Sequence, residues 1–215
     1  MRAVTDWKAR ITERLAGSEP RHAPEEWLLP GLSQEETHAL GVNFPKVLTA
    51  AAVLVPLVER APEITVLLTQ RAIELKSHAG QISFPGGRLE QGETPRAAAL
   101  REAREEIGLD PRFVSIAGYL PDHVLLSGFR VTPVVGFVRP GFELQLAEKE
   151  VQDTFEVPLG YVFEPANHRA RLRRLADGAA EVEVLDIPFG AHNIWGATAG
   201  MLVTLYRLCT GEAPP

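Results

Sequence analysis

The sequence predicts an α/β fold in which helices cover the faces of a mixed sheet. Three observations predict it. Apolar runs of strand length, rich in Val, Ile, Leu and Thr, occur on both sides of the middle of the chain. A segment with helix start and stop signals, residues 95–107, separates them. A further helical segment, about 195–209, closes the pattern.

The composition is that of an ordinary globular domain, with 45% hydrophobic and 23% charged residues among 215. A single cysteine, Cys209, rules out an internal disulfide and favours a cytoplasmic location. The charged N-terminus does not resemble a signal peptide, and no run of 18 apolar residues predicts a membrane span. A formal net charge of −6 argues against nucleic-acid binding by charge alone. An anionic substrate would therefore need local cations or a metal.

The N-terminal part predicts one short helix and an irregular segment. Trp7, Ile11 and Leu15 follow each other at four-residue spacing, which is typical of an amphipathic helix. Residues 17–45 are rich in Pro, Gly and Glu and predict no regular element. We therefore expect an N-terminal extension over residues 1–45 and one domain over residues 46–210.

Strands are expected on both sides of the central helix, where β-branched and apolar residues gather. Their ranges are 47–58 and 63–71 before the helix, and 113–120, 130–138 and 153–159 after it. Residues 168–189 predict a hairpin around an Asp177-Gly178 turn. Charges alternate along this hairpin, at Arg169, Arg171 and Arg173 and at Glu181 and Glu183. Cross-strand ion pairs are favoured here, and phosphate binding by the arginines is the alternative.

The central helix has clear ends. Thr94 is a good N-cap, Pro95 suits the first helical position and Gly108 suits the C-terminal stop. At about 100° per residue, Glu102, Glu105 and Glu106 share one face of this helix. Two like charges ~5 Å apart repel by roughly 3 kcal/mol at an effective dielectric of about 20. A solvated face is one interpretation, but the Gly-Gly pair upstream favours an oxygen-rich site for Mg²⁺ or Mn²⁺.

Residues 87–109, GRLEQGETPRAAALREAREEIGL, resemble the Nudix box. That box is a glycine, five residues, a glutamate, seven residues and then REUxEExGU, with U apolar. Every fixed position is filled, by Gly87, Glu93, Arg101, Glu102, Glu105, Glu106 and Gly108. The resemblance implies a Nudix-type α/β/α sandwich with a mixed sheet and a loop-helix-loop catalytic motif. It also implies hydrolysis of a nucleoside diphosphate linked to another group X.

The resemblance also implies roles for single residues. The metal ligands would be Glu102, Glu105 and Glu106, with the carbonyl of Gly87 or of its neighbour Gly86. The catalytic group would comprise Arg101, Glu105 and Glu106 and a general base from outside the box. Glu150 is our candidate for that base, with an acidic surface loop as the alternative. Arg101 would also hold the loop to the helix through Glu93.

Residues 67–87, LLTQRAIELKSHAGQISFPGG, resemble the extension that marks the coenzyme A pyrophosphatase branch of this family. Lys76 stands where the pattern has Arg, which keeps the charge but loses the bidentate fork. Further matches lie at 126–138, 150–159 and 194–202. The branch implies coenzyme A or acyl-CoA as substrate, with Arg71, Lys76 and Phe84 as substrate-binding residues.

We therefore expect a cytoplasmic, Mg²⁺- or Mn²⁺-dependent hydrolase that converts coenzyme A or acyl-CoA to 3′,5′-ADP and 4′-phosphopantetheine or its acyl derivative. A Nudix hydrolase of ADP-ribose or NADH is the first alternative. A non-catalytic Nudix-fold ligand sensor is the second, and the intact acidic positions of the box argue against it. A homodimer is compatible with the resemblance, and no nucleic-acid or membrane partner is expected.

Overall fold

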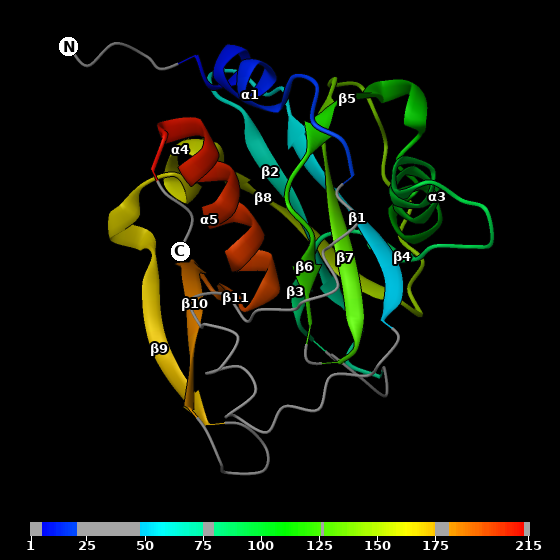
Figure 1. The fold of residues 1–215 in the computed structure, drawn as a ribbon. Helices are drawn as coiled ribbons and strands as arrows, with labels where there is room; N and C mark the ends of the chain where they lie inside the picture. The colour runs from blue at the N-terminus through cyan, green and yellow to red at the C-terminus, as the bar shows by residue number, and fades with distance from the viewer. Residues whose placement is uncertain (1–5, 21–47, 75–79, 126, 175–180, 213–215) are drawn as a thin grey trace.

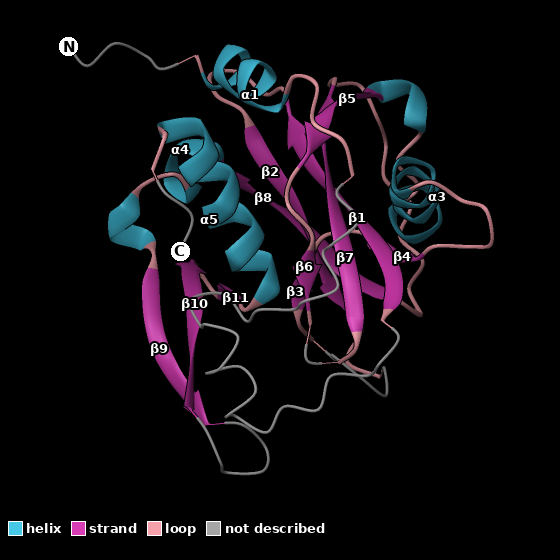
Figure 2. Cartoon of the chain, in the orientation of Figure 1, coloured by secondary structure: helices cyan, strands magenta, loops and turns pink. Residues whose placement is uncertain are grey.

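In the computed structural model, helices cover both faces of a mixed sheet, and a smaller three-stranded sheet lies beside it (Figures 1 and 2). The structure describes residues 6–20, 48–74, 80–125, 127–174 and 181–212. Within these ranges, none of the helices has the length and apolar character needed to cross a membrane. This arrangement confirms the predicted α/β/α sandwich with its mixed sheet.

In the part of the chain that the structure describes, the main sheet has eight strands. They are β1 (Thr49–Val58), β2 (Thr65–Arg71), β3 (Ile82–Ser83), β4 (Gly86–Arg88), β5 (Val114–Tyr119), β6 (His123–Val124), β7 (Phe129–Val138) and β8 (Val151–Pro158). β1 and β7 run parallel along their whole lengths, whereas the other pairs are antiparallel. The other edge of β1 is divided, because Leu57 and Val58 pair with β2 while residues 51–53 pair with β4. This division brings a glycine-bearing strand into the centre of the sheet.

The smaller sheet consists of β9 (Arg169–Arg174), β10 (Glu181–Phe189) and β11 (His192–Trp195), all antiparallel. The predicted strand pair is confirmed, while its expected turn at 177–178 lies outside the described residues. Arg171 forms an ion pair with the buried Asp186 on the neighbouring strand. Of Arg173, Glu181 and Glu183 only the backbone is described.

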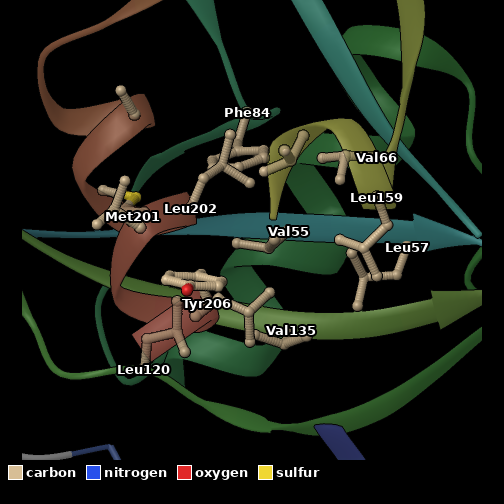
Figure 3. Close-up of a cluster of buried hydrophobic side chains, with 14 of the residues drawn as sticks. Val55, Leu57, Val66, Phe84, Leu120, Val135, Leu159, Met201, Leu202 and Tyr206 are labelled. Atoms are coloured by element: carbon tan, nitrogen blue, oxygen red, sulfur yellow. The ribbon is translucent and has the colours of Figure 1, made fainter. Parts of the chain in front are cut away.

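The helices are α1 (Trp7–Leu15), α3 (Pro95–Ile107), α4 (Leu159–Val162) and α5 (Ala197–Thr210), with short 3₁₀ turns η1 (Pro111–Phe113) and η2 (Pro165–Asn167). α5 packs large side chains against one face of the sheet, where Met201, Leu202 and Tyr206 meet Val55 and Val135 (Figure 3). α3 covers the opposite face and buries mainly small residues. Large side chains therefore fill the space between α5 and the sheet, whereas small side chains allow α3 to lie close to the opposite face.

α1 belongs to the same core as α5. Ile11 and Leu15 are both buried within that cluster. Ser18, just after the helix, accepts a hydrogen bond from the Tyr119 backbone N–H at 2.8 Å, and a side chain on Gly118 would overlap it. The expected boundary at residues 45 and 46 falls outside the described residues and stays a prediction. The predicted helix at the N-terminus is nevertheless an integral part of the fold.

Candidate functional site

The site is built where the glycines of β4 meet α3. Gly86 pairs with Val53 and Gly87 with Ala52 on β1. A Cβ on Gly86 would overlap the Ala52 carbonyl oxygen, and a Cβ on Gly87 would overlap the Glu102 carboxylate. Only glycine lets the backbone approach this closely from both sides. The Gly-Gly pair therefore allows the carboxylates of α3 to lie directly against the sheet.

α3 is fixed at both ends in the way its sequence predicts. The Thr94 hydroxyl accepts a hydrogen bond from the Ala97 N–H at 3.2 Å. Gly108 adopts the left-handed conformation, with φ of 70°, at the C-terminal end. Between these caps, Ala98, Ala99 and other small residues are fully buried against the sheet. The caps and the buried alanines thereby fix the rotation of α3 about its axis, and with it the direction in which the glutamates point.

Glu106 is the buried carboxylate of the site. Its side chain is only 5% exposed, and its Oε2 accepts a hydrogen bond from the Gly86 N–H at 3.1 Å. Burial raises the pKa of Glu106 to about 7, and the charges of Glu102 and Glu150 act in the same direction. The Gly86 hydrogen bond and the positive charge of Arg71 oppose that rise. Glu106 is thus a carboxylate whose negative charge is poorly compensated by the described residues around it.

Arg71 faces Glu106 from the end of β2. Its Nη1 lies 4.0 Å from Glu106 Oε1, beyond hydrogen-bond distance. Its Nε is buried and has no hydrogen-bond partner within the described residues. The backbone of Arg71 is fixed by hydrogen bonds with Gln81 and Gly80, next to a bulge in the β2–β8 ladder. A fixed backbone therefore holds the guanidinium close to the carboxylate site, with its Nε unpaired among the described residues.

Arg101 connects the loop before α3 to the helix. It forms two hydrogen bonds with Glu93, both 3.0 Å long, and a third with the Arg88 carbonyl at 3.1 Å. It also pairs with Glu102 at 2.9 Å and with Glu105 at 3.1 Å. The hydrogen bond with Arg101 lowers the pKa of Glu93. Arg101 therefore acts as an internal cation that offsets the repulsion within the carboxylate cluster.

Glu150 lies at the open side of the site. Its segment runs beside the end of α3, where the Ala147 N–H donates to the Glu106 carbonyl at 2.8 Å. The Glu150 carbonyl accepts from the Ala72 N–H at 2.9 Å, which ties this segment to the residue after Arg71. The Glu150 side chain is exposed, yet its charge acts on Glu106. The structure therefore places the backbone of Glu150 beside both Arg71 and α3, and its role as a base stays a prediction.

The donor set fits Mg²⁺ or Mn²⁺, which prefer oxygen ligands. Within the described residues, no three acidic, histidine or cysteine side chains already converge as a metal site, since Glu102 and Glu105 both turn to Arg101. Glu106 is the feature that fits a cation best, because among the described residues the one positive partner of its Oε1 is Arg71, at 4.0 Å. Glu102, Glu105 and Glu106 could hold the ion after small side-chain rotations.

The predicted substrate-binding residues have different outcomes. Arg71 lies at the site, and Lys76 lies outside the described residues. Phe84 is 4% exposed and packs against Leu202 of α5, on the opposite face of the sheet from Glu106 (Figure 3). The alternation of the chain after β3 turns this ring into the core, so the structure gives no support to the expected contact between Phe84 and substrate, which stays a prediction.

Sequence reasoning missed the Gly86 N–H as a hydrogen-bond donor to Glu106. The two residues are 20 positions apart, so periodicity along one element cannot connect them. The only signal was the paired glycines, which often mark a close backbone approach.

Three comparisons with known proteins bear on this site. The family model of the NUDIX domain matches residues 48–177. The chain is 40% identical to an "Uncharacterized Nudix hydrolase NudL" of Escherichia coli strain K12 over 154 residues, 71% of this chain and 78% of that protein. It has the same identity to a protein of that name from Cronobacter sakazakii, over 76% of this chain and 84% of the relative.

Solved structures were also compared. A Caenorhabditis elegans Ap4A hydrolase in a binary complex has a TM-score of 0.45 and 24% identity, over 51% of this chain and 80% of its own. The NUDIX domain of Shewanella oneidensis NrtR, complexed with ADP ribose, has a TM-score of 0.42 and 20% identity, over 59% and 85%.

Proposed function

We propose a substrate for this chain, which belongs to the Nudix hydrolase family. In this proposal the protein hydrolyses the pyrophosphate bond of coenzyme A and acyl-CoA. The observation that carries the proposal is Arg71. This residue belongs to the LLTQR segment that resembles the coenzyme A branch. Its Nη1 lies 4.0 Å from the Glu106 carboxylate, and its Nε has no hydrogen-bond partner among the described residues. Arginine suits phosphate oxygens, and a chain of net charge −6 needs such a cation to attract an anionic substrate.

The residues of the site support a hydrolytic mechanism. Glu102, Glu105 and Glu106 would hold Mg²⁺ or Mn²⁺, which when bound neutralises phosphate oxygens and favours attack by water. The oxygen of a water molecule adds to one phosphorus, and the bond from that phosphorus to the bridging oxygen breaks. Glu150 is our candidate to accept the proton of this water, supported by its exposure and its electrostatic influence on Glu106.

Two further residues position these groups. Arg101 fixes the orientation of Glu102 and Glu105, and Arg71 contacts the phosphate oxygens that the metal leaves free. The products are 3′,5′-ADP and 4′-phosphopantetheine or its acyl derivative. The cytoplasmic location and a homodimer are part of the same proposal, supported by the single cysteine and by the family resemblance.

A panel of diphosphates tests this function directly. The protein is incubated with Mg²⁺ or Mn²⁺ and with coenzyme A, acetyl-CoA, ADP-ribose or NADH, and the products are identified by mass spectrometry. We expect the highest kcat/KM for the coenzyme A compounds. A higher kcat/KM for ADP-ribose or NADH would favour the alternative hydrolase, and an absence of turnover with every compound would favour a ligand sensor.

A further inference from the structure

A groove of about 370 Å³ lies directly beside the carboxylate site. It is lined by Ala72, Ile73, Glu74, Glu148, Val151 and Gln152. Its two walls are formed by residues that directly follow Arg71 and Glu150 in the sequence. Ala72 follows Arg71, Val151 follows Glu150, and the Ala72 N–H donates to the Glu150 carbonyl at 2.9 Å. A ligand held at Arg71 and Glu150 therefore has its next atoms at the mouth of this groove.

The groove combines an apolar floor with an acidic rim. Ala72 and Val151 are buried in the floor, whereas Ile73 stands 66% exposed beside them. Glu74 and Glu148 are exposed carboxylates, and none of the described lining residues is cationic. An isolated exposed isoleucine needs no explanation, but here it stands next to a catalytic centre. Such a groove repels phosphate groups and suits a neutral ligand that has methyl groups and hydrogen-bond donors.

We propose that this groove binds the pantetheine arm of the substrate at its junction with the diphosphate. The inference rests on the proposed function, because it assigns the pantetheine half of coenzyme A to this groove. The methylene group that joins the arm to the phosphate is followed by a carbon that bears two methyl groups, and these contact Ile73. The hydroxyl and amide N–H groups that follow donate to Glu74, Glu148 or Gln152. The acidic rim directs the 3′-phosphate of the adenosine half to the other side of the site.

Each of the two reaction products contains one half of the substrate, so their inhibition constants report on the two halves separately. 4′-Phosphopantetheine carries the arm, while 3′,5′-ADP does not. We expect Ile73→Asp to raise the inhibition constant of 4′-phosphopantetheine by about tenfold, because a charge replaces apolar contact. The inhibition constant of 3′,5′-ADP should change by less than about twofold, and kcat/KM for coenzyme A should fall by about tenfold. Ile73→Leu should retain most of both affinities, since it keeps the apolar surface.

Leu172 on β9 provides the matched control, because it is 68% exposed and lies in the other sheet. Leu172→Asp should leave all three constants unchanged. The expected result is a selective loss for the arm-bearing product in Ile73→Asp alone, with a thermal melting point close to that of the wild type. Equal changes for both products, or no change for either, would overturn the inference while coenzyme A hydrolysis still supports the proposed function. A wild type that hydrolyses no coenzyme A compound would overturn both.

Discussion

The two faces of the main sheet are packed in opposite ways. On the α5 face, long side chains such as Leu202 and Phe84 pack together in a hydrophobic cluster. On the α3 face, alanines and the two glycines of β4 bring helix and sheet so close that a backbone N–H reaches Glu106. Small residues thus permit a buried carboxylate, because they let a backbone N–H come close enough to donate the hydrogen bond that the carboxylate needs. The bulkiest packing and the candidate site therefore lie on different faces of the sheet.

The largest expected effect tests the α5 face. Leu202 is fully buried, so Leu202→Ala should lower the free energy of unfolding by about 2–5 kcal/mol. Because the carboxylates lie on the other face, kcat/KM below the melting temperature should remain near the wild-type value. Urea denaturation and steady-state kinetics measure the two quantities. A large loss of kcat/KM in the folded variant would show that the faces are not independent.

The next prediction concerns the pH dependence of the α3 face without metal. Glu106 has a pKa of about 7 in the folded protein, above the ordinary value of 4.5. The folded state thus holds the proton more tightly, so this group's contribution is fully present below pH 4.5 and is lost as the pH rises to about 7.

That loss amounts to at most about 3 kcal/mol at 1.36 kcal/mol per pKa unit. Glu106→Gln should abolish it. Chemical denaturation of both proteins in a chelator, from pH 4 to 8, gives the difference. Parallel curves for wild type and variant would contradict the assignment.

The same substitution should stop the chemistry. Loss of a residue that merely orients a metal ligand costs about 10–100-fold, so loss of a ligand in Glu106→Gln should lower kcat by more than about 100-fold. The fold should persist, because the hydrogen bond from Gly86 can be kept by the amide oxygen. Circular dichroism provides the control for folding. Turnover near the wild-type rate would remove Glu106 from the metal site.

A smaller effect is expected at Arg71, whose charge both supports Glu106 and competes with a metal. Arg71→Gln should raise the affinity for Mn²⁺ by a few fold, consistent with about 1 kcal/mol for a partly exposed ion pair. It should simultaneously lower kcat/KM for coenzyme A, because a phosphate contact is lost. Isothermal titration with Mn²⁺ and kinetics test the two changes. Weaker Mn²⁺ binding would instead mean that Arg71 only supports the local structure.

Much of the α3 face could be predicted because its information is local. The capping residues define the ends of α3, and the spacing of Glu102, Glu105 and Glu106 places them together. Their different environments could not be predicted, since exposure of Glu105 and burial of Glu106 depend on where β4 joins the sheet. The burial of Phe84 could not be predicted for a related reason. A motif gives the identity of a residue, but the face to which a strand turns it depends on its partners.

The packing of α1 has a practical consequence for anyone who clones this gene. The family model begins at residue 48, which invites a shortened version that starts there. Such a version would uncover the apolar surface that Ile11 and Leu15 now shield, and it would remove the Ser18 hydroxyl that caps the Tyr119 N–H. We expect the truncated protein to aggregate during expression. A protein trimmed at the family boundary would then appear inactive because it lacks α1, whose side chains complete the core.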